Sequence, residues 1–343
     1  MRDLLVAGGG PVGLATALYA ARAGLDVAVR EPRDGTIDKA CGEGLMPGAV
    51  ASLTGLGVPL DGHPITGIRY VDARRPGLAA EAPFRHGPGR GVRRTTLHAA
   101  LAATVAAAGV PVEPCAVREV EDRGDHLLVD GEPVRHLVAA DGLHSRVRRL
   151  AGLDAPVGGP RRYGLRTHVP LAPWTSLVEV HWAPAGEAYV TPVGGDRVGV
   201  AVLSDERRPF AELVGEFPLL AARLVGCDLG GVRGAGPLRQ RSRRRVAGRV
   251  LLVGDAAGYV DALTGEGIAL GLAQARAAVA AVAAGRPEAY ERAWRRLGWR
   301  HDLLTKGLLT ASRHPALRGR VVPAAARLPR VFGAAVDQLA RPA

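Results

Sequence analysis

Residues 250–271 read VLLVGDAAGYVDALTGEGIALG, and the rest of the chain can be placed around this stretch. The apolar run 250–253 is typical of a buried strand, and Asp255 follows at its carboxyl end, where open α/β sheets hold their ligands. Gly265 and Gly267 let the backbone approach a flat ligand closely, and the apolar residues 268–284 predict a helix whose free N–H groups face the same place. This pattern indicates a binding site for an anionic group or an electron-accepting ring.

The N-terminal residues form a second strand, turn and helix. Residues 3–7 predict an apolar strand, 14–23 a helix and 26–31 a further strand that ends in Glu31. The GGGPVG turn at 8–13 fits GxGxxG: Gly8 permits the bend, Gly10 admits a pyrophosphate, and Gly13 lets the helix lie close to the sheet. Glu31 can accept a hydrogen bond from a ribose hydroxyl, which argues against a 2′-phosphate there. The unit predicts a bound dinucleotide and leaves FAD and NAD(P) both open.

The loop 38–45, DKACGEGL, follows the second strand and can fold back over the cofactor. It carries Lys39, Cys41 and Gly42 and leads into a helix predicted over 47–56. No second cysteine or neighbouring histidine accompanies Cys41, so we interpret it as a small buried residue in preference to a reactive thiol. Residues 65–84 alternate loosely around a turn at 74–77 and predict a hairpin.

A helix is expected after residue 94, capped by Thr95 or Thr96 and ended by Gly109. Arg94, just before that N-terminus, can reach phosphate or flavin edges. Residues 117–140 predict three short strands in a meander, which deliver Asp141-Gly142 into a turn and a basic helix.

Composition bounds the class of protein. The chain has 343 residues, 47% hydrophobic and 4% aromatic, with a formal net charge of +12 carried almost entirely by arginine. Its densest arginine run, 239–249, has no interleaved aromatic residue to stack bases, so a solvated face is favoured over nucleic-acid binding. The three widely spaced cysteines suit neither a disulfide scaffold nor a metal site, and we expect a cytoplasmic protein.

No stable membrane insertion is expected. Residues 4–21 lack charge, but the glycines and proline at 8–11 would break a spanning helix. There is no basic leader of the kind a signal peptide carries.

Taken together, these motifs resemble the FAD-dependent monooxygenases of the aromatic-hydroxylase type and the geranylgeranyl-reductase-like flavoproteins, which share one fold. The matching residues are Gly8, Gly10, Gly13, Glu31, Arg94, Leu97, Asp141, Gly142, Ser145, Arg148, Gly254, Asp255 and the segment 263–267. One departure is Ala262, where the family usually has a proline, and it bears on the shape of the flavin-side loop.

The resemblance implies an FAD site and gives its residues roles. Glu31 would bind the adenosine ribose, Arg94 would reach the pyrophosphate side, Val117 would offer backbone to the adenine, and Asp255 would hold the ribityl chain. The helix at Ile268 would stabilise negative charge on the reduced ring. The full expected cofactor set is Gly8, Gly10, Pro11, Gly13, Glu31, Lys39, Cys41, Gly42, Arg94, Val117, Asp141, Gly142, Gly254, Asp255, Gly265, Gly267 and Ile268.

The middle of the chain is where substrate recognition is expected. Residues 162–169, 176–182, 188–193 and 197–203 alternate as four strands of an antiparallel sheet. Its period of two pairs Arg166 with His168, Glu179 with His181, and Tyr189 with Thr191. The expected substrate residues are Arg166, His168, His181, Tyr189 and Thr191, and three of them, His168, His181 and Tyr189, could move a substrate proton. The alternative is a solvent-side pair between Arg166 and Glu179.

The sequence therefore predicts a mixed α/β fold in three parts. A Rossmann-like FAD-binding domain with a β-meander comprises 1–64, 90–160 and 246–285. An antiparallel-sheet substrate domain comprises 65–89 and 161–245. A C-terminal helical segment comprises 286–343, with a helix from Pro287 to about Arg313.

No second glycine-rich strand–helix unit follows, so NAD(P)H would act only as a transient donor. By resemblance, we expect a monooxygenase that uses O2 and a flavin hydroperoxide to hydroxylate or epoxidise a small aromatic or apolar substrate. The alternative is an FAD-dependent ene reductase acting on prenyl or other lipid double bonds. A halogenase is less favoured because its WxWxIP-type stretch is absent from the sequence.

Overall fold

The computed structural model describes residues 1–159 and 161–341. Its first sheet is built around five parallel strands, which the buried apolar runs of the sequence form. Leu4 and Val6 of the first strand face one side of the sheet, and Leu5 and Ala7 face the other. The parallel strands are β8 (Val112–Glu113), β2 (Val27–Arg30), β1 (Arg2–Ala7), β11 (Glu132–Ala139) and β18 (Val250–Leu252), with β17 (Val246–Ala247), β10 (Leu127–Val129) and β9 (Val120–Asp122) added antiparallel.

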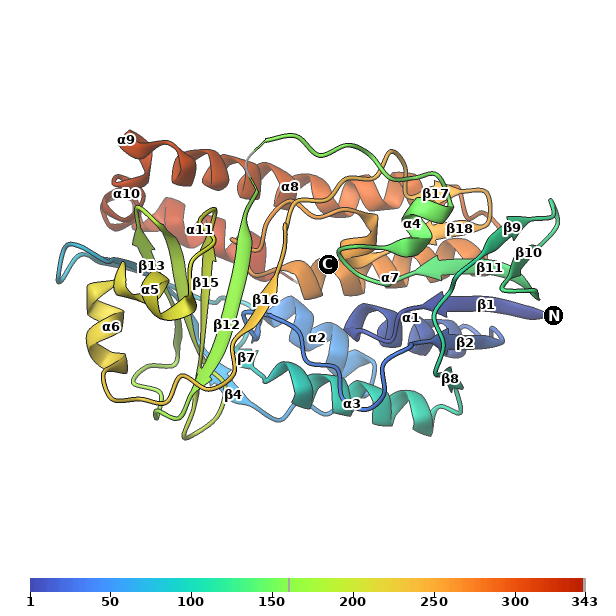
Figure 1. Cartoon of the computed structure of the whole chain (residues 1–343), viewed down its shortest axis with the longest axis horizontal. Helices are drawn as coiled ribbons and strands as arrows, with labels where there is room; N and C mark the ends of the chain where they lie inside the picture. Colours follow the sequence, from blue (N-terminus) through green and yellow to red (C-terminus); the bar gives the residue numbers. More distant parts are fainter. Residues whose placement is uncertain (160, 342–343) are drawn as a thin grey trace.

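Helices cover one face of this sheet and the meander covers the other (Figure 1). On the helical face, α1 packs against both α3 and α7. The helices are α1 (Pro11–Arg22), α2 (Pro47–Gly55), α3 (Arg94–Ala107) and α7 (Gly267–Ala283), with the short α4 (Arg146–Leu150) and 3-10 turn η1 (Gly254–Ala257) at the strand ends. The expected Rossmann-like arrangement is confirmed.

The second sheet has seven strands, more than the four that the alternation predicted. Its order is β16-β12-β15-β14-β13-β5-β6. The sheet is antiparallel except that β13 pairs parallel with β5, because the hairpin 65–84 joins the edge left by β13. The strands are β5 (Gly67–Asp72), β6 (Ala79–Pro83), β12 (Tyr163–Val169), β13 (Leu177–Ala183), β14 (Gly186–Pro192), β15 (Val198–Ser204) and β16 (Arg233–Ala235).

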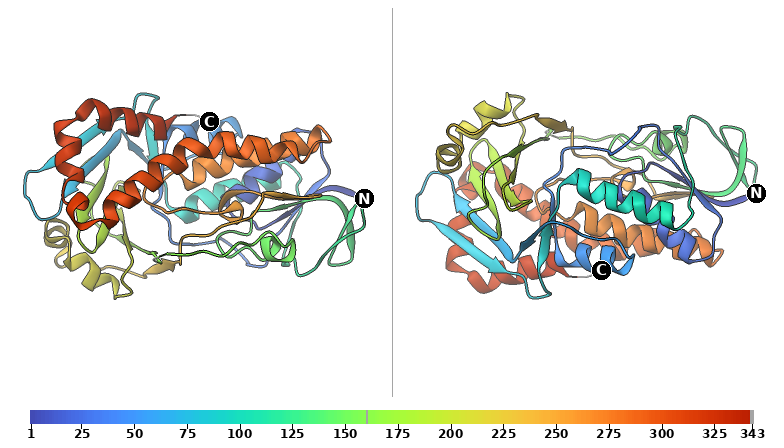
Figure 2. Two further views of the ribbon diagram at one scale, coloured as in Figure 1. Left: turned by 90° about the horizontal axis from the view of Figure 1, so that it is seen from above. Right: turned by 90° about the horizontal axis from the view of Figure 1, so that it is seen from below.

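Two helical groups enclose this sheet. On one face, α5 (Phe210–Gly215) and α6 (Pro218–Leu224) pack on the valines of β15. The C-terminal helices α10 (Val321–Arg327) and α11 (Pro329–Ala340) lie against β5 and β6, reached through the long α8 (Ala289–Arg313) and α9 (Pro315–Arg318). Figure 2 shows these helices along one side of both sheets. A small sheet of β3 (Gly44–Leu45), β7 (Gly89–Gly91) and β4 (His63–Ile65) was not anticipated.

None of the helices in the described ranges is both long and apolar enough to cross a membrane.

An ion-pair cluster joins β8, β2, β1 and the start of β11 in the first sheet. Glu113 accepts from Arg2 Nη1 and from Arg30 Nε, each at 2.9 Å, and Arg30 also contacts Asp130 and Glu132. Burial opposes the charge of Glu113, but the two guanidinium groups outweigh it and hold its pKa below the ordinary 4.5.

Because the folded pKa of Glu113 is lowered, its contribution to stability is present above pH 4.5 and is lost as the pH falls through the folded pKa. We therefore expect Glu113→Gln to flatten the acid side of the stability profile. Urea unfolding over a series of pH values measures this, with the exposed carboxylate variant Glu119→Gln as the control. Equal acid losses in wild type and Glu113→Gln would contradict the assignment.

Candidate functional site

The turn between β1 and α1 is shaped by two close backbone approaches. Gly8 has φ +103°, and a Cβ there would lie 2.6 Å from the Ala140 carbonyl oxygen. A Cβ on Gly13 would lie 1.8 Å from the Gly8 carbonyl oxygen. Any side chain at these positions would force the turn, the helix and β11 apart, so both glycines build the turn without lining the cavity next to it.

Glu31 lies on the far side of the same turn. Its Oε2 accepts from the Gly9 amide at 2.7 Å, and Arg33 pairs with the carboxylate. Burial opposes ionisation, but Arg33 and the Gly9 amide lower the pKa of Glu31. Glu31 lines a separate cavity of about 250 Å³ with His98 and Pro114, which suits the adenosine end of a dinucleotide. Val117 is buried and lines neither cavity.

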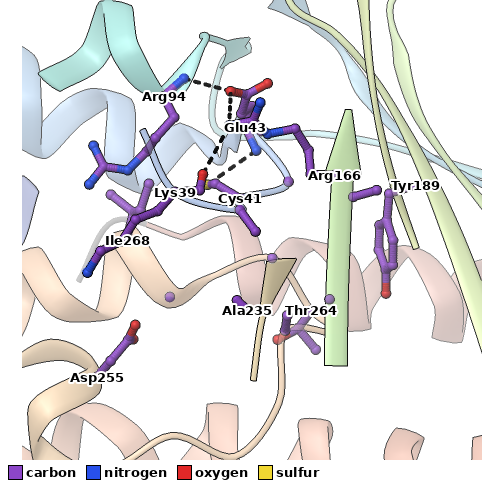
Figure 3. A pocket seen from close by; sticks show the side chains of 18 of the residues that line it. Lys39, Cys41, Glu43, Arg94, Arg166, Tyr189, Ala235, Asp255, Thr264 and Ile268 are labelled. Atoms are coloured by element: carbon purple, nitrogen blue, oxygen red, sulfur yellow. Dashed lines mark hydrogen bonds and ion pairs between the residues drawn. The ribbon is translucent and has the colours of Figure 1, made fainter. Parts of the chain in front are cut away.

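The main cavity, of about 550 Å³, extends from the dinucleotide turn to α11. Its cofactor-side wall comes from five separate parts of the chain, which meet at the carboxyl ends of the parallel strands (Figure 3). Of the residues that the sequence indicated for FAD, this wall contains Gly10, Pro11, Lys39, Cys41, Gly42, Arg94, Asp141, Gly142, Gly254, Asp255, Gly265, Gly267 and Ile268.

Several polar groups on this wall have no hydrogen-bond partner among the described residues. Whether these groups match the polar groups of FAD tests whether FAD fits the cavity. Asp141 Oδ2 accepts from the Arg146 and Val147 amides and so caps α4, whereas its buried Oδ1 has no partner among the described residues. Arg94 Nη1 is likewise buried without one. The first turn of α7 also opens on the cavity without a side-chain cap. One cation, one carboxylate and a helix N-terminus fit a pyrophosphate, a polyol and a ring that gains negative charge.

Asp255 lies at the end of β18 and faces this wall. Burial raises the pKa of its carboxyl group, and the charges of Lys39 and Arg94 oppose that rise. If FAD is seated here, Asp255 would accept hydrogen bonds from the ribityl hydroxyls and Arg94 would meet the pyrophosphate.

Ala262, the position of the missing proline, also lines the cavity. The loop around it is held by Asp261, whose Oδ1 accepts from the Leu263 amide at 3.1 Å and from Arg162 Nη1 at 3.0 Å. Arg162 also pairs with the buried Glu187 of β14. The buried ion triad of Arg162, Asp261 and Glu187 restrains this loop, as a proline would. In the sequence, the only sign of the triad is that its charged residues lie beside or within apolar strands.

Glu43, which the sequence placed only within the loop 38–45, connects the loop to both α3 and the seven-stranded sheet. It is 3% exposed, and its backbone has φ +59°, which is rare for a residue with a side chain. Its Oε1 accepts from the backbone amide of Arg94 at 2.7 Å. The expected caps Thr95 and Thr96 are wrong, because α3 begins at Arg94 and its N-terminus is covered by Glu43 instead.

The second oxygen of Glu43 reaches the seven-stranded sheet. Nδ1 of His168 lies 3.2 Å from Arg166 Nη1 and must accept, since arginine only donates. Nε2 therefore carries the proton and donates to Glu43 Oε2 at 2.6 Å. His168 is thus fully engaged, does not line the cavity, and is a structural bridge in this fold instead of a proton carrier to substrate.

His181 lies away from the cavity, contrary to its expected place. Val178 and Val180 of β13 face the cavity, so the alternating residues Glu179 and His181 face the other side of the sheet. There His181 Nε2 lies 3.3 Å from Glu179 Oε2. The alternative pair of Arg166 with Glu179 is also wrong, since the two occupy opposite faces and Arg166 contacts Asp38.

The other expected substrate residues line the cavity but use their polar atoms on its walls. The Tyr189 hydroxyl donates to the Leu263 carbonyl oxygen and Thr191 to that of Gly42, both at 2.8 Å. Arg166 donates to the Lys39 carbonyl oxygen at 3.1 Å and pairs with Asp38. These side chains fasten the two flavin-side loops to the sheet.

Comparison with known proteins places this site in a family. The chain is 31% identical over 328 residues to a menaquinone reductase of Mycolicibacterium smegmatis, covering 85% of this chain and 79% of the relative. It is 30% identical over 302 residues to a digeranylgeranylglycerophospholipid reductase of Methanothermobacter thermautotrophicus (79% and 74%). It is 32% identical over 307 residues to a ubiquinone hydroxylase of Rhodospirillum rubrum (79% and 70%). No protein-family model matches the chain.

Solved structures agree on the fold. A p-nitrophenol 4-monooxygenase from Pseudomonas putida superposes with a TM-score of 0.82 at 19% identity, covering 99% of this chain and 98% of that one. A geranylgeranyl bacteriochlorophyll reductase-like protein from Thermoplasma acidophilum gives 0.77 at 20% identity, covering 98% and 95%.

The fold and site define a flavin-dependent oxidoreductase that uses FAD. The chain belongs to the flavoprotein superfamily that unites aromatic-hydroxylase-type monooxygenases with geranylgeranyl-reductase-like enzymes.

Removing the Asp255 carboxylate should weaken FAD binding. A hydrogen bond to a charged group contributes about 1.5–3 kcal/mol, so we expect Asp255→Ala to raise the FAD Kd by about 10- to 100-fold. Titration of the apoprotein, followed by flavin fluorescence, measures this. Asp205→Ala, at an exposed position beyond β15, is the control. An unchanged Kd for Asp255→Ala would exclude Asp255 from the flavin seat.

Removing Glu43 should cost stability as well. Glu43→Ala leaves the Arg94 amide uncapped and Arg166 with one fewer carboxylate beside it, and we expect a loss of about 2–4 kcal/mol in unfolding free energy. Denaturant unfolding checks this. Glu43→Gly separates the effects, because glycine relaxes the left-handed backbone. If Glu43→Ala unfolds with the same free energy as wild type, the side-chain contacts are not what stabilises this loop; if Glu43→Gly is no more stable than Glu43→Ala, the left-handed backbone is not strained.

Proposed function

We propose that this protein reduces a carbon–carbon double bond in an isoprenoid lipid, with FAD as the hydride carrier. The observation that supports this most is the apolar character of the cavity beyond the flavin wall. Its far end is lined by side chains with no ionisable group except two tyrosines, namely Met46, Ile65, Ile68, Tyr70, Phe84, Val178, Val180, Tyr189, Leu263, Val336 and Leu339. Such a wall recognises a hydrocarbon chain by burial alone.

The cavity remains apolar because the polar side chains of the sheet bind the loops. Thr191 and Tyr189 donate to main-chain carbonyls, and Arg166 donates to one and pairs with Asp38. A phenolic substrate would need a hydrogen-bond partner for its hydroxyl group, and those partners are already engaged.

Adding hydrogen across a double bond requires a hydride and a proton. When bound, FAD supplies the hydride. Burial, and next the negative charge of Glu43, raise the pKa of the Cys41 thiol, so Cys41 stays protonated in the cavity wall. Tyr189 is also protonated, but its proton is held by the Leu263 carbonyl oxygen. Tyr70 and Tyr259 also line the cavity as protonated hydroxyls, and we assign proton delivery to Cys41 because it lies on the wall that would hold the flavin.

Oxygenation of a small aromatic or apolar substrate is the second candidate. The resemblance to a ubiquinone hydroxylase favours it, since that relative covers 79% of this chain. In both reactions we propose NAD(P)H as the electron donor that visits the site transiently, with O2 required only for oxygenation.

One experiment tests the choice. FAD-loaded protein is reduced without oxygen by NADPH or dithionite and mixed with detergent-dispersed menaquinone or a geranylgeranylated glycerol lipid. We expect products that gain two hydrogens, and no label when the reaction is repeated under ¹⁸O2. Leu339→Trp, which fills the apolar end, should lower turnover at least about tenfold with the flavin retained.

Val225→Trp, at an exposed position after α6, is the matched control. Incorporation of ¹⁸O into the product would replace the reductase assignment with the hydroxylase one. Reduced flavin that transfers nothing to either lipid would overturn the isoprenoid assignment.

A further inference from the structure

Four large apolar side chains are exposed on α8 and at the start of α11. Trp299 and Leu303, one turn apart on α8, are 55% and 65% exposed, and Leu328 and Val331 at the start of α11 are 56% and 63% exposed. We call these four residues the C-terminal patch. Exposed apolar residues scattered singly are ordinary, but two pairs on helices of one layer call for a partner.

The charges around the patch are strongly one-sided. Residues 289–341 contain eleven Arg and Lys and three Asp and Glu, which gives this segment a net charge of +8. The whole chain has a net charge of +12, so most of it lies in these helices. Glu291 pairs with Arg295, Asp302 with Lys306 and Asp337 with Arg341, so all three acids are engaged by bases of the same segment. Exposed arginines adjoin the patch in sequence on both helices, at Arg296, Arg300, Arg327 and Arg330.

One of these helices, α11, closes the apolar end of the cavity. Arg300 Nη1 lies 3.5 Å from Gln338 Oε1, so the middle of α8 is next to the C-terminal half of α11. Val336 and Leu339 of α11 line the cavity, and Phe332 packs on Tyr70 with ring centroids 4.6 Å apart. Helix α11 therefore carries both Val331 of the patch and the cavity-lining Val336 and Leu339, and Figure 2 shows α8 and α11 along the same side of the molecule.

We propose that the C-terminal patch docks on the surface of an anionic lipid bilayer. Tryptophan and leucine side chains enter the boundary between headgroups and acyl chains, and the surrounding arginines contact lipid phosphates. The charge of the helices selects this partner, because a neutral or cationic surface would leave the arginines unpaired. The protein would lie on the membrane, with the apolar end of the cavity nearest to it. This inference rests on the proposed function insofar as the substrate is a lipid.

Co-sedimentation of the FAD-loaded full chain with vesicles tests the docking. We expect binding to phosphatidylcholine vesicles with about 30% phosphatidylglycerol, at least about tenfold tighter than to phosphatidylcholine alone, and weakened on going from about 0.1 M to about 1 M salt. Trp299→Gln with Leu303→Gln, and separately Arg327→Gln with Arg330→Gln, should each weaken binding about tenfold.

Matched controls are Val225→Gln for the apolar change and Arg118→Gln with Arg123→Gln for the charge change, since both lie away from the C-terminal helices and are exposed. Wild-type protein that ignores anionic vesicles, or patch variants that bind them as wild type does, would overturn the docking surface. Patch-dependent binding without reduction of any detergent-dispersed prenyl lipid leaves docking established and defeats the reductase proposal alone.

Discussion

The buried carboxylate of Glu43 joins the two halves of this protein. One oxygen caps α3, which belongs to the cofactor side, and the other accepts from His168 on β12, which belongs to the seven-stranded sheet. Left-handed backbone costs a side-chain-bearing residue about 1–2 kcal/mol, and the two hydrogen bonds of the carboxylate offset this cost. The positions of Cys41 and Gly42 in the cavity wall follow from that constraint.

A common principle governs the polar side chains of the sheet. Arg166, Tyr189 and Thr191 all face the cavity, and all three bind the main chain of the loops that surround the flavin wall. Cross-links of this kind hold the loops close to the sheet while leaving hydrocarbon on the surface that a substrate meets. The same hydrogen bonds therefore restrain the loops and leave the facing wall of the cavity apolar.

Much of the fold could be predicted from local sequence. The strand–turn–helix units around Gly8 and Asp255 are short, and each residue acts on neighbours within a few positions. The failures involve distant partners. Alternation shows that Glu179 and His181 share a face, but only the pairing of β13 with β5 and β14 decides that the valines take the cavity side. The cap of α3 comes from a residue 51 positions away, which no local pattern at Thr95 or Thr96 can reveal.

The order of strands in the first sheet has a consequence for how the protein is made. The flavin wall draws on β1 and its turn, on the loop after β2, on α3, on β11, and finally on β18 and α7. Five strands of the seven-stranded sheet, β12 to β16, lie between β11 and β18 in the chain, and the other two, β5 and β6, come earlier. No contiguous fragment that leaves out the seven-stranded sheet therefore contains all parts of this wall, and a growing chain completes the wall only after that sheet has been synthesised. The chain can therefore bind the cofactor at a complete site only late in its synthesis. A chain that ends anywhere before α7 lacks part of this site.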